Sequence, residues 1–106
     1  MTLSHAVQRK DLNNPAALKQ WINTLNVEAS SVNQIVTPRR SKMAGEAAWV
    51  WEWTCSSGCW NYAIRVPRGK DVYSVRCRLM PSENTPAAQA RCKGLAKNLK
   101  IASAKA

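Results

Sequence analysis

Three tryptophans at alternate positions, Trp49, Trp51 and Trp53, restrict the fold of this 106-residue chain more than any other feature. A period of two is that of a β-strand, so the three indole rings belong to one face of a strand. A small domain needs large buried side chains, and tryptophan supplies much apolar area per residue. We therefore expect the row to lie in the core; the alternative is an exposed platform that stacks bases or sugars.

Two further strands are predicted after the tryptophan strand of residues 46–54, over residues 60–66 and 72–79. Both alternate between apolar residues on one face and polar or small residues on the other. Small residues over 55–59 indicate a turn, and Pro67-Arg68-Gly69-Lys70 indicates a hairpin loop. The three runs predict an antiparallel meander with one solvated face.

A helix is predicted on either side of these strands. Asn14-Pro15 suits a helix start, and apolar residues follow at helical spacing to about residue 26. Thr85-Pro86 begins a second helix, whose expected apolar face consists of Ala88, Cys92, Leu95 and Leu99. Its expected polar face consists of Gln89, Arg91, Lys93, Lys97 and Lys100. The segment 27–45 is harder to assign: residues 32–36 suit a short strand or a helical turn, and residues 38–42 suit a basic loop.

The predicted fold class is α+β, a three-stranded antiparallel meander sheet in α-β-β-β-α order with both helices packed on one face. The tryptophan row is assigned to that covered face, together with Trp60, Tyr62 and Ile64 of the next strand, because Glu52 and Thr54 alternate with it. Residues 1–13 are expected to be a flexible N-terminal segment, 14–101 a single domain and 102–106 a frayed tail.

This element order is similar to that of double-stranded-RNA-binding domains. Three strands followed by a helix are also similar to the integrase-arm and plant AP2-type DNA readers, whose sheet enters the major groove. The resemblance is one of element order only, and the chain has no motif specific to either group. The arginines of the predicted sheet fit the DNA readers better, so the resemblance implies DNA rather than RNA.

The balance of charge indicates the kind of partner. The chain has 16 Lys and Arg against 6 Asp and Glu, a formal net charge of +10, and most of this excess follows Trp60. Such a charge suits nucleic acid, an anionic membrane or an acidic protein surface. No apolar run is long enough for a membrane span, and residues 1–14 lack the apolar core of a signal peptide. We therefore expect a cytoplasmic protein without a membrane partner.

Basic residues gather on the predicted solvated face of the sheet and in two loops. Arg65, Arg76 and Arg78 alternate with the apolar residues of their strands, so they are expected opposite the core. Guanidinium groups pair with phosphates and guanine edges. The sequence predicts a small nucleic-acid-binding protein, with duplex DNA favoured over RNA. The predicted binding residues are Arg65, Arg68, Lys70, Arg76, Arg78, Arg39, Arg40 and Lys42.

Three other interpretations of these residues stay open. The arginines suit a plain solvated face, or a non-catalytic accessory or inhibitor protein that docks on an acidic partner. The tryptophans suit a carbohydrate-binding module if they are exposed. The position of the tryptophan fluorescence maximum would distinguish exposed rings, which this last interpretation requires, from a buried row.

Catalysis, metals and cofactors find little support in the sequence. His5 is the only histidine and lies in the expected flexible segment, and the acidic residues form no evident pair for acid–base chemistry. Cys55 and Cys59 lack the usual spacing of zinc or redox motifs, and cytoplasmic cysteines are expected to be thiols. Cys77 and Cys92 are expected to face each other in the core, bridged if the compartment is oxidising. We predict a non-enzyme with no metal site and no cofactor.

Overall fold

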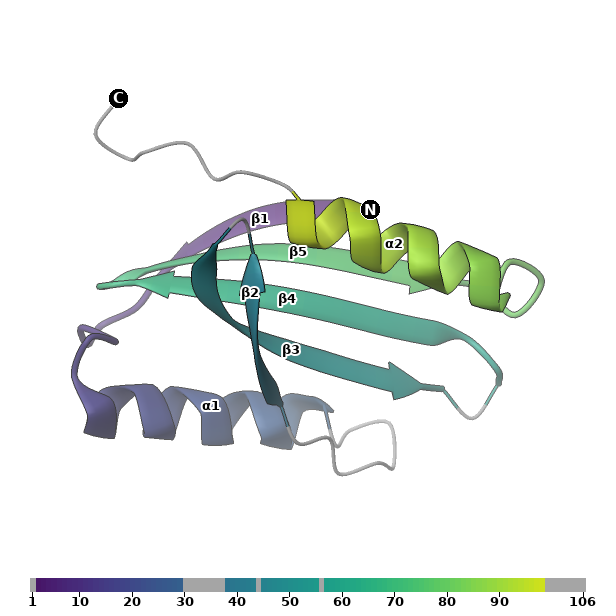
Figure 1. Ribbon diagram of the computed structural model, residues 1–106. Coiled ribbons are helices and arrows are strands. Elements are labelled where there is room, and N and C mark those ends of the chain that lie inside the picture. The colour runs from purple at the N-terminus through teal and green to yellow at the C-terminus, as the bar shows by residue number, and fades with distance from the viewer. Residues whose placement is uncertain (1, 30–37, 44, 56, 99–106) are drawn as a thin grey trace.

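A computed structural model describes residues 2–29, 38–43, 45–55 and 57–98, with only the backbone of 26–29 described. Five strands form one antiparallel sheet in the order β1-β5-β4-β3-β2 (Figure 1). They are β1 (Thr2–Val7), β2 (Arg39–Met43), β3 (Glu46–Thr54), β4 (Trp60–Arg68) and β5 (Asp71–Leu79). Helices α1 (Pro15–Ala29) and α2 (Pro86–Asn98) pack on opposite faces of this sheet.

The predicted three-stranded meander with both helices on one face is therefore wrong. Its three strands are present as β3, β4 and β5, but β1 and β2 extend the sheet at its two edges. β1 lies within the segment expected to be flexible, and β2 within the expected basic loop. Every residue of β1 is exposed, and the strand is held to β5 by backbone pairing. Its side chains therefore need not alternate between apolar and polar, and the pattern that predicts a strand is absent from the sequence.

The sheet separates two hydrophobic clusters. We call the face under α2 the α2 face; its core contains Tyr62 and Ile64 of β4 and packs against Ala96 of α2. We call the opposite face, under α1, the α1 face; it carries Trp51 of β3 and Ala63 of β4, which pack with Trp21 of α1. Each strand thus contributes alternate residues to two cores.

The tryptophan row lies on the α1 face. Trp51 is 1% exposed and its ring meets that of Trp21 edge-on, with 5.9 Å between centroids. Trp49 and Trp53 are partly buried in the same cluster, so their prediction as core residues is confirmed. Their assignment to the face of Trp60 and its strand neighbours is wrong, because Trp51 pairs with Ala63 rather than with an even-numbered residue of β4.

Both helix starts are capped as predicted. The Oδ1 atom of Asn14 accepts hydrogen bonds from the backbone N–H groups of Ala16 and Ala17, at 2.9 and 3.2 Å. The Oγ1 atom of Thr85 accepts one from the N–H of Ala88 at 3.2 Å. In the part of the chain that the structure describes, neither helix is long and apolar enough to cross a membrane.

The apolar face predicted for α2 is only partly correct. Ala96 is fully buried and Cys92 packs on the core, whereas Leu95 is 55% exposed. The helix is rotated so that Gln89 and Lys93, expected on its outer side, are partly buried against the sheet. Leu99 and the expected frayed tail, 102–106, lie outside the described residues, as does the segment 32–36.

All four cysteines are paired, in contrast to the expected thiols. Cys55 and Cys59 form a disulfide across the β3–β4 turn, with 5.0 Å between their Cα atoms. Cys77 of β5 and Cys92 of α2 form the second, with a Cα–Cα distance of 6.3 Å. The expected facing of Cys77 and Cys92 is confirmed, and their bridge joins α2 covalently to the sheet.

Candidate nucleic-acid interface

The five strands divide their charges between the two faces of the sheet. The strand register places five basic residues and no acidic one on the α1 face of the described strands. These five side chains are Arg40 and Lys42 of β2, Arg65 of β4, and Arg76 and Arg78 of β5. A surface with one sign of charge creates the field that attracts an anionic partner.

Acidic residues of the strands lie on the α2 face, and each one contacts a basic group. Glu46 accepts two hydrogen bonds from Arg68, at 2.7 Å from Nε and 2.6 Å from Nη2. Asp71 lies 2.8 Å from the Nε2 atom of His5. Glu52 contacts several donors, described below. The positive charge of the strands on this face is therefore largely balanced.

Each ring of the tryptophan row lies under an arginine. The guanidinium carbon of Arg65 lies 4.7 Å from the ring centroid of Trp51. Arg40 lies over Trp49 at 5.6 Å and Arg76 over Trp53 at 5.9 Å. Stacking on an aromatic face orients a guanidinium group and leaves its edge N–H donors directed outward. The row thus holds arginines in place on the same face that lacks acids.

Helix α1 packs against the tryptophan row of β3 and Ala63 of β4, two strands that lie between β2 and β5 in the sheet. Arg40 and Lys42 are exposed on β2, and Arg76 and Arg78 are exposed on β5. Strands β2 and β5 are three strand spacings apart in the sheet, or about 14 Å. The two exposed basic pairs therefore lie on the strands that border the two strands against which the helix packs.

The outward side of α1 is polar. Lys19, Gln20, Asn23 and Thr24 are exposed, whereas Ala17 and Trp21 face the sheet. An open hollow of about 440 Å³ lies beside the helix, lined by residues 7–10 and by Gln20, Trp21 and Thr24. Lys10 also lines it, and its Nζ atom donates to the Oε1 atom of Gln20 at 3.2 Å.

The predicted site residues divide between the two faces. Arg65, Arg76, Arg78, Arg40 and Lys42 lie together on the α1 face, although this face is not opposite the tryptophans as expected. Arg39 and Arg68 lie on the α2 face in ion pairs with Glu52 and Glu46. Lys70 is exposed in the β4–β5 hairpin, where Gly69 has a φ angle of 63°.

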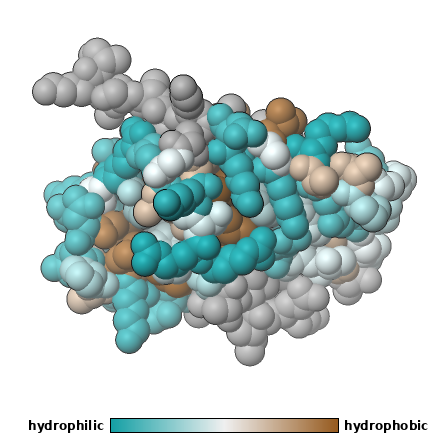
Figure 2. All heavy atoms as spheres, in the orientation of Figure 1, coloured by the Kyte–Doolittle hydropathy of each residue, from teal (hydrophilic) through white to brown (hydrophobic). Residues whose placement is uncertain are grey.

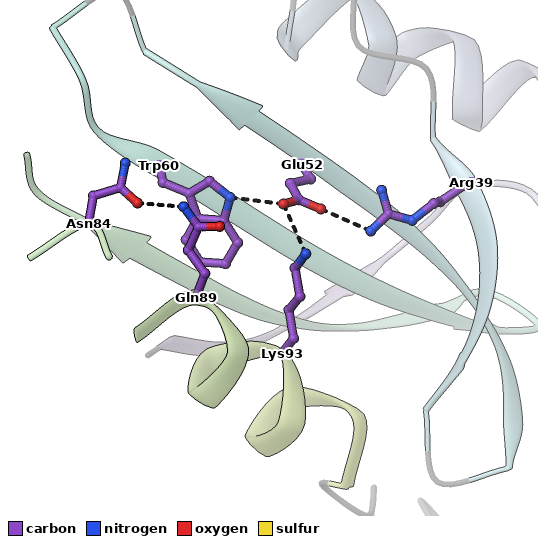
Figure 3. A network of polar contacts seen from close by, with 6 residues as sticks. All are labelled: Arg39, Glu52, Trp60, Asn84, Gln89 and Lys93. Atoms are coloured by element: carbon purple, nitrogen blue, oxygen red, sulfur yellow. Dashed lines mark hydrogen bonds and ion pairs between the residues drawn. The ribbon is translucent and has the colours of Figure 1, made fainter. Parts of the chain in front are cut away.

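Glu52 is the centre of a polar network between the sheet and α2 (Figure 3). Its carboxylate accepts hydrogen bonds from Nη2 of Arg39 at 2.9 Å and Nε1 of Trp60 at 3.0 Å, and Nζ of Lys93 lies 3.1 Å away. Partial burial alone would raise the pKa of Glu52, but these three donors outweigh burial and hold that pKa below its ordinary value. The network links α2 to the sheet through Lys93 and engages the guanidinium group of Arg39 in an ion pair.

The outer surface on the side seen in Figure 2 is mostly hydrophilic, with smaller hydrophobic areas between the polar side chains. Exposed large apolar residues occur singly at Leu3, Val7, Met80 and Leu95 among the described residues. Scattered apolar residues of this kind are ordinary for a protein surface. The division of charge is therefore the more informative property of this surface.

Sequence reasoning missed the stacking of arginines on tryptophans. The missing information was the register across the β3–β4 turn, since a shift of one residue exchanges the two faces of a strand. One available signal was Ala63: a small residue beside Trp51 and Arg76 leaves room for larger neighbours on the same face. The role of Glu52 was missed because Glu52 and Thr54 alternate with the tryptophans along the strand, so both were expected on the solvated face.

Comparison of the chain with protein-family models, with curated proteins and with solved structures found no match. The functional argument therefore rests on the residues of the α1 face.

Proposed function

We propose that this protein binds nucleic acid through the α1 face of its sheet, with duplex DNA as the favoured ligand. The observation that supports this most directly is the division of charge, with five basic and no acidic side chains on that face of the described strands. Phosphate contacts from Lys and Arg dominate the affinity of such proteins. The net charge of +10 adds long-range attraction for a polyanion.

The position of α1 favours docking by a helix rather than by the bare sheet, which the sequence had suggested. The strands β2 and β5, which carry the basic pairs, are about 14 Å apart on either side of the strands against which α1 packs. The register offsets the two pairs by about four residues, so their centres are about 20 Å apart. The major groove of B-DNA is about 12 Å wide and admits an α-helix. With α1 in the groove, Arg40 and Lys42 would meet one phosphate ridge, and Arg76 and Arg78 the other.

The outward residues of α1 suit the floor of such a groove. Gln20 and Asn23 have side-chain amides, which form paired hydrogen bonds with adenine edges, and Lys19 can donate to guanine. Base-edge contacts from three side chains would give sequence preference, whereas the flanking basic pairs would give affinity.

Affinity is expected to fall steeply with salt. Four phosphate contacts, from Arg40, Lys42, Arg76 and Arg78, correspond to a log–log slope of about −3.6 on duplex DNA, and fewer contacts to a proportionately smaller slope. The test is a fluorescence-anisotropy titration of random duplex DNA, single-stranded DNA and duplex RNA at several salt concentrations. The first variant is Arg76→Gln with Arg78→Gln, which should reduce the magnitude of the slope by about 1.8.

A matched control removes the same charge from the other side of the molecule. Arg91→Gln with Lys97→Gln changes two exposed residues of α2 and should leave the slope as in the wild-type protein. Equal effects of the two double variants would show that net charge alone drives binding, and would contradict the interface. No binding to any of the three nucleic acids at low salt would reject the proposal and favour an acidic protein partner.

A further inference from the structure

The turn between β3 and β4 is closed by the Cys55–Cys59 disulfide at the edge of the proposed interface. The backbone N–H of Cys55 donates to the carbonyl of Cys59 at 2.7 Å, and the N–H of Gly58 donates to the carbonyl of Cys55 at 3.0 Å. Cys55 is partly exposed, whereas Cys59 is 1% exposed. Cys55 is therefore the cysteine of this bridge that is more accessible to a reagent from solution.

Two polar side chains of the α1 face surround these sulfur atoms. Asn61 is 4% exposed, and its Nδ2 atom lies 3.2 Å from Sγ of Cys55 and 3.7 Å from Sγ of Cys59. The Nη2 atom of Arg78 lies 3.8 Å from Sγ of Cys59. Asn61 and Arg78 are direct cross-strand partners, so β4 and β5 hold both donors in place. A cation and an amide N–H beside sulfur stabilise its thiolate form.

We propose that Cys55–Cys59 is a thiol–disulfide exchange site that accepts electrons from an external dithiol. The thiolate of the dithiol attacks Sγ of Cys55 and forms a mixed disulfide. The Cys55–Cys59 bond breaks, and its electron pair leaves on Sγ of Cys59, beside Arg78. Exchange is faster when the leaving thiol has a lower pKa, so the position of the cation suits this direction of attack.

The second sulfur of the dithiol completes the reaction. As a thiolate it attacks the reagent sulfur bound to Cys55, which closes a disulfide in the reagent and releases Cys55 as a thiolate. Cys55 and Cys59 then take up protons from water to the extent that their pKa values require. The protein disulfide has gained two electrons and the dithiol has lost them.

The Cys77–Cys92 disulfide provides an internal comparison. Cys77 is 3% exposed in the core of the α2 face, and Cys92 packs on the same core from α2. Access to a disulfide is one of the factors that set its exchange rate. The same reagent should therefore reduce this bridge more slowly than Cys55–Cys59.

The test measures reduction of both bridges in the oxidised full chain. The protein is treated with dithiothreitol, samples are quenched with an alkylating reagent, and peptide mass spectrometry follows each cysteine. Reduction of Cys55–Cys59 is expected first. Arg78→Gln should slow it several-fold without changing Cys77–Cys92, Arg78→Lys should restore part of the rate, and Arg9→Gln serves as a charge-matched control.

Equal rates for the two bridges in the wild-type protein would overturn the proposal. So would an Arg78→Gln rate equal to that of Arg9→Gln. Treatment with glutathione provides a second readout, because the mixed disulfide should form on Cys55 rather than on Cys59. A mixed disulfide mainly on Cys59 would contradict the proposed direction of attack. These measurements use no nucleic acid, so their outcome is independent of the proposed binding function.

Discussion

The substitution Glu52→Gln tests whether the network under α2 stabilises the fold. Gln keeps the size of Glu but removes its charge and one acceptor oxygen. The wild-type carboxylate contacts Arg39, Trp60 and Lys93 at 2.9, 3.0 and 3.1 Å. A hydrogen bond to a charged group contributes about 1.5–3 kcal/mol, whereas an exposed ion pair contributes less than about 1 kcal/mol.

The exposure of each partner decides how these contributions combine. The side chain of Arg39 is 59% exposed, so its pair adds little, whereas Glu52 itself is 22% exposed. Trp60 and Lys93 both contact Oε2, so a Gln carbonyl oxygen at that position still accepts from both, but without the negative charge, and its NH2 group then faces the guanidinium group of Arg39. We therefore expect a loss of about 2 kcal/mol in the free energy of unfolding, which lowers Tm by about 8–16 °C.

Urea unfolding followed by circular dichroism measures this loss, and Glu46→Gln is the matched control. Glu46 lies on the same strand and face, but in the described structure its contacts are to Arg68 alone, and its side chain is 35% exposed. That control should lose about 1 kcal/mol or less. The reasoning is refuted if Glu52→Gln destabilises the protein no more than Glu46→Gln does.

The pH dependence provides a second check on the same residue. Since the pKa of Glu52 is lowered in the folded protein, its contribution to the free energy of unfolding is complete at pH values above 4.5, the ordinary pKa of this group. The contribution is lost as the pH falls through the lower folded pKa, because both states then bind the proton. The stability difference between wild type and Glu52→Gln should therefore shrink below about pH 4.5.

Two further substitutions test the packing and the helix start. Tyr62→Phe should leave stability unchanged or raise it by up to about 1 kcal/mol, because the buried hydroxyl of Tyr62 has no hydrogen-bond partner within the described structure; a loss above about 1 kcal/mol in urea unfolding would contradict this. Asn14→Ala removes the acceptor for two N–H groups of α1 and should cost about 1 kcal/mol, whereas Asn14→Ser should restore most of it; thermal unfolding equal to wild type in the Ala variant would show that the cap is not needed.

Local patterns were sufficient to predict the central part of the fold. The expected strands over 46–54, 60–66 and 72–79 correspond to β3, β4 and β5, and the caps at Asn14 and Thr85 begin the two helices. These features depend on residues close together in the chain, such as a polar cap before proline or apolar residues at alternate positions.

The number of strands and the side of each helix could not be predicted in the same way. β1 is exposed throughout, so nothing in its side chains indicates the backbone ladder to β5. The side of α1 depends on the register that pairs Trp51 with Ala63. A helix packs on each face of the sheet, so apolar and polar residues occur on both faces. The expectation that one face is covered and the other solvated was therefore wrong. The expected grouping of Arg65, Arg76 and Arg78 followed from strand alternation, but their position over tryptophans did not.

The Cys77–Cys92 bridge gives the two helices unequal attachment to the sheet. It tethers α2 to β5, so α2 cannot separate from the sheet while the bridge is intact. In the described structure α1 packs through side chains such as Trp21, without a covalent link to a strand. Sub-global opening of a protein follows its less constrained units. Release of α1 alone is therefore the lower-energy opening, and it would uncover Trp51 together with the arginine stacked on it. Amide hydrogen exchange would show this as weaker protection in α1 than in α2.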